Sequence, residues 1–172
     1  RHPPMGCCGS RALPVSLQQV QEVLVELPTV FPGTKVSCVI HEEGHVVSKH
    51  AAESVSDEDL VSLVSNVKQA ALQFASVLNQ KTCPRIHIKG AASLYSCYDV
   101  GPQHVLALFT DMHGTRMESF DMERADKRMA PLLRRVRDAL DSTPSSSSSA
   151  AQMAPEGGKL LPPIVIEAEI KH

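Results

Sequence analysis

Residues 41–45 read His-Glu-Glu-Gly-His and match the H-E-x-x-H pattern of zinc hydrolases. The zinc chemistry requires a helix, because only there do histidines four residues apart share one face while the glutamate acts as general base. β-Branched residues flank the match on both sides, which is typical of strands, and Gly44 suits the positive φ of a tight turn. We therefore expect a β-hairpin whose turn splays His41 and His45 apart, with no metal site. A zinc hydrolase is the remote alternative.

No other pattern in the sequence predicts catalysis. The phosphate-binding pattern G-x-x-x-x-G-K-[ST] and the serine nucleophile elbow do not occur. The five cysteines include no C-x-x-C pair, and such an odd, unpatterned set is typical of a reducing compartment. Histidines within strand patterns, such as His87 and His104, are more often structural than catalytic. We expect no enzyme, no catalytic residue and no cofactor.

The stretch Met-Gly-Cys-Cys-Gly-Ser near the N-terminus has the residue types of a dual acylation signal. If Met5 is the initiator, Gly6 becomes the N-terminus and matches the myristoylation pattern, with Cys7 and Cys8 as neighbouring palmitoylation sites. One myristoyl chain binds a membrane only marginally, and a second acyl chain makes the attachment stable. If residues 1–4 belong to the natural chain instead, Gly6 is internal and cannot be myristoylated.

Composition excludes several classes of protein. The 172 residues are 42% hydrophobic and 21% charged with a net charge of −2, which is ordinary for a globular chain of one domain with tails. Aromatic residues make up 3% and tryptophan is absent, so neither charge nor base stacking predicts a nucleic-acid partner. No apolar run is long enough to span a membrane. We expect a cytoplasmic protein, which acylation would place at the cytoplasmic face of a membrane.

Hydrophobic spacing predicts that residues 14–141 form one α+β domain. The expected elements, in order, are a helix from Ser16 to Leu27, a hairpin over 34–50, a long helix from Ser56, strands over 85–89, 94–98 and 105–109, and a helix over 119–140. Pro131 should kink or restart the last helix, because it removes a hydrogen bond and clashes with the preceding turn.

The long helix has the clearest start, because Ser56 can cap it and three acidic residues follow in its first turn. Its predicted inward stripe consists of Leu60, Leu63, Val64, Val67, Ala71, Phe74 and Leu78. Between Leu60 and Gln80 the only charged residue is Lys68. The face away from the stripe carries Ser62, Asn66, Gln69, Gln73 and Ser76. Such depletion of charge is typical of the core of an interface; a neutral solvated face is the alternative.

Both ends of the chain lie outside the predicted domain. Residues 1–13 are irregular, and residues 142–158 are rich in Ser, Pro and Gly, which predicts a flexible linker. Residues 159–172 regain a strand pattern, with Ile164, Ile166, Ala168 and Ile170 on one face. We expect this segment to add as a sixth strand, either to the open edge near residues 46–50 or to the edge of a partner. A disordered tail is the alternative.

Residues 16–140 resemble the roadblock family of dynein light chains and GTPase regulators. The resemblance rests on the order of elements and on three stretches: the hairpin VSCVIHEEGHVVSKHA, the acidic helix start SDEDL, and the strands RIHIKGAASLYSCYDVGPQHVLALFTD. It implies the roadblock/profilin-like α-β-β-α-β-β-β-α arrangement, which is a five-stranded antiparallel sheet flanked by helices. The possible addition in this chain is the extra C-terminal strand.

The resemblance also implies a non-enzymatic scaffold that dimerises with another roadblock-domain chain, as a homodimer or a heterodimer. The dimer contact is expected on the charge-poor face of the long helix and on the strand after it, Arg85, Ile86, His87, Ile88 and Lys89. The further partner is expected to be a small GTPase, as in the Ragulator complex on lysosomes. A dynein intermediate chain is the alternative, and a lysosomal or ciliary location stays open.

Overall fold

The computed structural model describes residues 15–113, 120–142 and 164–167. In chain order the elements are α1 (Val15–Glu26), a 3₁₀ turn (Leu27–Thr29), β1 (Thr34–His41), β2 (His45–Ala51), α2 (Asp57–Val77), β3 (Arg85–Lys89), β4 (Ser93–Asp99), β5 (His104–Asp111), α3 (Met122–Asp141) and β6 (Ile164–Glu167). The predicted order of helices and strands is confirmed.

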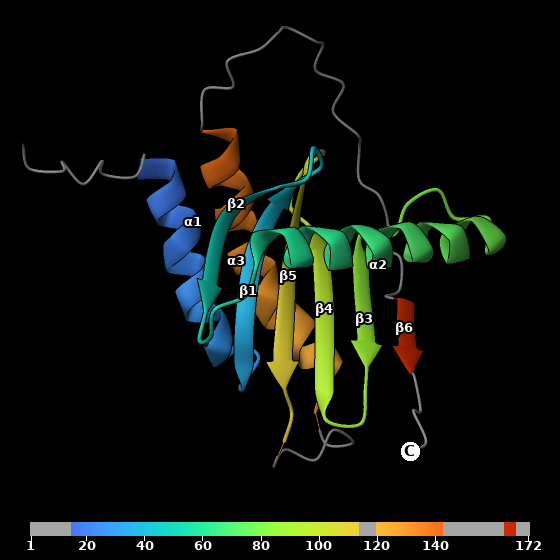
Figure 1. The fold of residues 1–172 in the computed structure, drawn as a ribbon. Coiled ribbons are helices and arrows are strands. Elements are labelled where there is room, and N and C mark those ends of the chain that lie inside the picture. The colour runs from blue at the N-terminus through green and yellow to red at the C-terminus, as the bar shows by residue number, and fades with distance from the viewer. Residues whose placement is uncertain (1–14, 114–119, 143–163, 168–172) are drawn as a thin grey trace, which may run out of the picture.

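All six strands form one sheet in the order β2-β1-β5-β4-β3-β6. The first five pair antiparallel with their neighbours, and β6 runs parallel to β3. α1 and α3 lie side by side on one face of the sheet, and α2 crosses the other face (Figure 1). The fold is therefore α+β, with a five-stranded antiparallel sheet flanked by helices, as the sequence predicts.

Alternation along the strands gives each face of the sheet its own apolar core. The core beneath α1 and α3 is built from larger side chains, among them Leu24, Phe31, Leu106, Leu108, Met129 and Val136, all fully buried. The core beneath α2 contains the small residues Cys38, Cys97 and Ala107, which let the helix approach the sheet closely. Burial raises the pKa of the Cys38 and Cys97 thiols to about 12, so both stay protonated and unreactive.

α3 differs in two ways from the predicted helix. It begins at Met122 rather than at residue 119, because Asp121 caps it by accepting a 2.9 Å hydrogen bond from the backbone N–H of Arg124. It also continues through Pro131 without a restart, which was one of the two outcomes expected there. Pro131 lies on the exposed side of the helix, where water can satisfy the carbonyl that loses its helical partner.

Within the described residues, none of the helices has the length and apolar character needed to cross a membrane.

Candidate functional site

α2 packs on the sheet through a narrower stripe than predicted. Leu60, Val64, Ala71 and Ala75 are buried against the sheet, whereas the predicted core residues Leu63, Phe74 and Leu78 are 46%, 55% and 62% exposed. The C-terminal turns of α2 extend past β3, where less of the sheet lies beneath the helix (Figure 1). The prediction that these three residues point inward is therefore wrong.

A second apolar stripe runs along one flank of α2 and is exposed except at Val67, which is half-buried against the core beneath the helix. Leu63, Val67, Ala70, Phe74 and Val77 follow one another at spacings of four, three, four and three residues. This is the spacing by which one helix packs against another. Val77 is 80% exposed, and Leu78 beside it continues the apolar surface. An exposed apolar stripe of this kind is a candidate surface for binding a partner.

The charge-poor face predicted from the sequence borders this stripe. Ser62, Asn66, Gln69, Gln73 and Ser76 are exposed polar residues on the outer side of α2 in the single chain. Asn66 and Gln73 each lie one turn before a member of the stripe, so the two surfaces are continuous. Lys68, the one charged residue between positions 60 and 80, turns to the sheet instead, where it pairs with Asp99 and donates to the carbonyl of Cys83. The outer surface of α2 along this stretch is therefore uncharged.

The strand after α2 lies differently from the expected dimer contact. The side chains of Ile86 and His87 are fully buried within the chain, Ile86 beneath α2 and His87 near Asp126 of α3. The edge of β3 is paired with β6, in the register Ile86↔Ile164 and Ile88↔Ile166. The other three residues of this strand, Arg85, Ile88 and Lys89, remain partly exposed. Ile86 and His87 are therefore covered within the single chain, and the dimer contact at this strand stays a prediction.

The sixth strand forms, but not at the edge predicted for it. The sequence analysis expected it near residues 46–50, on β2, or at the edge of a partner, whereas the structure places it on β3 of the same chain. The β2 edge carries Lys49, whose ammonium bonds to Asp57 and to the carbonyl of Val55, the latter at 2.7 Å. A charged residue of this kind discourages strand addition. Ala168 and Ile170, with the acylation candidates Gly6, Cys7 and Cys8, lie outside the described residues.

A polar network joins α3 to β3 and β4. Asp126 of α3 accepts hydrogen bonds from the Tyr98 hydroxyl at 2.8 Å and from the Arg85 guanidinium at 2.6 Å. Its Oδ1 also lies 3.2 Å from Nε2 of His87, and Nδ1 of His87 lies 2.9 Å from the Ser96 hydroxyl. Ser96, His87 and Asp126 follow the order of a catalytic triad. Because His87 and Ser96 are fully buried, no substrate can reach this serine, and the network is structural.

Opposing effects set the charge of Asp126. Burial acts to raise the pKa of this carboxyl, but the neighbouring His87 ring, the hydrogen bond from Tyr98 and the charge of Arg85 outweigh it and hold the pKa below its ordinary value. Burial also raises the pKa of the Tyr98 hydroxyl, which therefore stays a donor. The carboxylate is thus held ionised by donors from two strands. The sequence did not single out Asp126, Tyr98 or Ser96, because their meeting depends on the packing of α3.

The H-E-x-x-H match lies on a hairpin, as predicted. His41 ends β1, His45 begins β2, and Gly44 adopts a φ of +83° in the turn between them. The predicted splaying of the imidazoles is wrong. The two rings stack with centroids 4.7 Å apart, because the residues are direct cross-strand partners and such partners point to the same face.

A third histidine joins this pair. His104 at the start of β5 is the cross-strand partner of His41, and the two ring centroids lie 4.8 Å apart in an edge-to-face arrangement. Burial lowers the pKa of His104, and the charges of His41 and His45 lower it further, against the opposing carboxylates of Asp141 and Glu42. His45, His41 and His104 therefore form a row across β2, β1 and β5, which we call the histidine row. The sequence could not reveal it, because it depends on the register between β1 and β5.

This order of elements around a five-stranded antiparallel sheet is the roadblock/LC7 fold. The chain is similar to gliding protein MglB from Thermus thermophilus, with 16% identity, a TM-score of 0.62, and coverage of 76% of this chain and 94% of that one. A roadblock/LC7 domain from Streptomyces avermitilis has 17% identity, a TM-score of 0.58, and coverage of 71% and 98%. MglB in a tetrameric arrangement has 16% identity, a TM-score of 0.62, and coverage of 76% and 93%.

No protein-family model matches the sequence, and no curated protein matches it. At the identities above, the similarity to solved structures establishes the fold.

Proposed function

We propose that this protein is a non-enzymatic roadblock-type scaffold that pairs with another roadblock-domain chain through α2. The observation that carries the proposal is the outer surface of α2, where an apolar stripe with helix-packing spacing borders an uncharged polar face. A helix that faced only water would carry charged residues on this surface. The fold supports the same assignment, since one similar structure is MglB in a tetrameric arrangement.

The partner that fits this stripe is an equivalent helix. A stripe at alternating spacings of four and three is self-complementary when two copies meet about a twofold axis. Phe74 is the largest exposed side chain of the stripe, at 55%, and supplies its aromatic anchor. The β3 edge is paired with β6 in this chain, so α2 provides the contact on which the proposal rests.

The assembly proposed for this scaffold is a small-GTPase regulatory complex at a cytoplasmic membrane face. It follows from the resemblance to the roadblock family and from the likeness of the fold to MglB. Acylation at Gly6, Cys7 and Cys8 is the proposed means of attachment, since two or more acyl chains are needed for stable anchoring. The alternative partner is a dynein intermediate chain, and the second experiment below distinguishes it from a small GTPase.

Sedimentation equilibrium of the full chain tests the α2 contact. We expect a dimer, and we expect Phe74→Glu to weaken it by about tenfold or more, because each contact then buries an unpaired carboxylate. Gln73→Glu, beside the stripe, should weaken it less. Val25→Glu is the matched control, because Val25 is an apolar residue of α1 that is 53% exposed. A monomeric wild type at high concentration, with no roadblock-domain chain bound to it in cells, would refute the proposal.

A second experiment addresses the partner beyond the dimer. The full chain purified from its native cell should retain a small GTPase, and Phe74→Glu, as the comparison, should retain less of it because the dimer is weakened. Recovery of dynein intermediate chains in its place would assign the protein to a motor and contradict the GTPase-related role, while leaving the α2 contact intact.

A further inference from the structure

The histidine row collects metal-binding side chains that the sequence leaves apart. His45, His41 and His104 come from three neighbouring strands and point to one face of the sheet, with adjacent ring centroids 4.7 and 4.8 Å apart. The row lies at the end of the β1–β2 hairpin. Imidazole is the commonest protein ligand for zinc and related transition metals.

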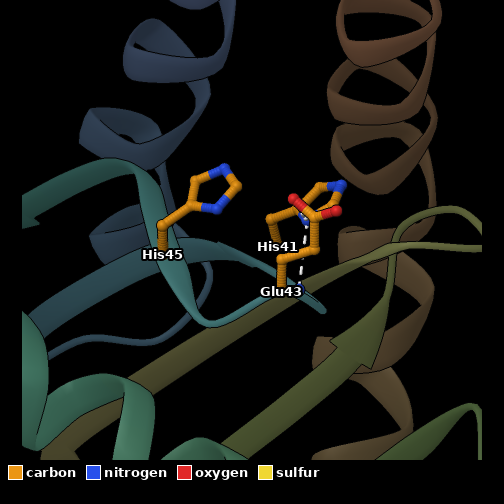
Figure 2. A group of neighbouring side chains, drawn as sticks. All are labelled: His41, Glu43 and His45. Atoms are coloured by element: carbon orange, nitrogen blue, oxygen red, sulfur yellow. Dashed lines mark hydrogen bonds and ion pairs between the residues drawn. The ribbon is translucent and has the colours of Figure 1, made fainter. Parts of the chain in front are cut away.

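The turn brings a carboxylate to the same place. Oε2 of Glu43 lies 3.7 Å from Nδ1 of His41, and one ligand atom each from His41, Glu43 and His45 lie within 4.8 Å of one another. Figure 2 shows the three side chains on the same side of the hairpin. The backbone N–H of Glu43 donates to Nδ1 of His41 at 3.1 Å, so a metal bound at this nitrogen would replace that hydrogen bond.

We propose that His41, Glu43 and His45 bind one divalent transition-metal ion of the zinc class, with His104 beside them as a further imidazole. The His41 side chain is 14% exposed and supplies the fixed ligand, whereas Glu43 is 76% exposed and His45 is exposed. The side chains of Glu43 and His45 can therefore rotate until the ligand atoms lie roughly 2.0–2.2 Å from one ion. These are the bond lengths that zinc forms with nitrogen and carboxylate oxygen. Two imidazoles and one carboxylate select zinc, copper or nickel over magnesium and calcium.

The proposed site differs from that of a zinc hydrolase. In H-E-x-x-H enzymes the glutamate directly after the first histidine is the general base. Here that residue is Glu42, whose backbone N–H is bonded to the carbonyl of Gln103 at 2.8 Å, and the carboxylate that joins the cluster belongs to Glu43. The metal would link the end of β1 to the start of β2 at the tip of the hairpin, beside His104 of β5. This role is structural and does not depend on the contact at α2.

A zinc titration of the full chain tests the site. Cys7→Ser with Cys8→Ser provides the background, so that these thiols do not compete for the metal. With Zn²⁺ alone as the probe and a chromophoric chelator as competitor at neutral pH, we expect one ion per chain. His45→Ala and Glu43→Gln should each lower the affinity by about tenfold or more, since even residues that only orient metal ligands contribute that much. His50→Ala, on the same strand, and His113→Ala are the matched controls and should bind as the background chain does.

Thermal unfolding supplies a second measurement that does not depend on the competitor. Zinc should raise the Tm of the background chain and of the His50→Ala variant, because a ligand that binds the folded state stabilises it. It should raise the Tm of His45→Ala less at the same zinc concentration, because the weakened site is less occupied, and unfolding without metal shows that this variant is folded. The proposal is overturned if the background chain competes for zinc no better than buffer, or if His50→Ala loses as much affinity as His45→Ala.

Discussion

The hydroxyl of Tyr98 donates a 2.8 Å hydrogen bond to Oδ1 of Asp126, and this contact joins β4 to α3. The same carboxylate accepts from Arg85 and lies beside His87, both on β3. The Asp126 side chain is only 8% exposed, so these groups replace the water that an ionised carboxylate would otherwise require. The network therefore holds α3 against β3 and β4.

Replacement of Asp126 should destabilise the protein strongly. Asp126→Asn keeps the shape of the side chain but removes the charge that Arg85 and His87 face, and loss of one partner of a buried ion pair costs about 3–5 kcal/mol. The measurement is the free energy of unfolding by denaturant. Asp138→Asn is the control, because Asp138 lies on the exposed side of α3 and its change should stay within about 0.5 kcal/mol. Equal losses in the two variants would contradict the network's role.

The same carboxyl predicts part of the acid sensitivity. The pKa of Asp126 is lower in the folded protein than its ordinary value of 3.8. The folded state therefore binds this proton less readily than the unfolded state, so the stabilisation is complete above the ordinary pKa and is lost as the pH falls through the folded pKa. We expect the difference in unfolding free energy between wild type and Asp126→Asn to shrink below about pH 4. A difference that stays constant from neutral to acid pH would count against this assignment.

The pairing of β6 with β3 predicts protected amides. Hydrogen exchange should be slower at residues 164–167 than in the serine tract 145–149, because ladder hydrogen bonds protect an amide. Val165→Pro removes a backbone donor and should speed exchange in both β6 and β3. Ser147→Pro, in the tract itself, should leave β3 unchanged. If the amides of 164–167 exchange as fast as the serine tract, the sixth strand does not persist in solution.

Acylation stays a prediction of the sequence. If Met5 initiates the chain, Gly6→Ala should move the protein from the membrane fraction to the cytosol, because myristoylation requires an N-terminal glycine. Cys7→Ser with Cys8→Ser should make the attachment transient, since one acyl chain binds a membrane only marginally. Intact mass of the native protein provides the measurement. A mature chain that begins before Gly6 and carries no acyl group would exclude the mechanism.

Much of the fold could be predicted from local signals. Gly44 between two runs of β-branched residues indicated the hairpin, and its φ of +83° confirms the reason. The acidic start of α2 at residues 57–59 and the three strands after it were also predicted. The spacing of the second stripe of α2 can also be read from the sequence, but some of its residues were assigned to the single broad inward stripe predicted for that helix. Leu63 and Phe74 belong to the flank that faces away from the sheet.

The sequence by itself determined the type and order of the elements, because helix and strand periodicities and turn residues act over a few neighbouring positions. Tertiary structure alone decided which histidines meet, which carboxylate lies beside His87, and which edge receives β6. Each of these depends on pairing or packing between segments far apart in the chain, such as the register of His41 with His104. A one-residue change of register would turn His104 to the other face of the sheet. The histidine row therefore exists through the pairing of β1 with β5, which no local pattern encodes.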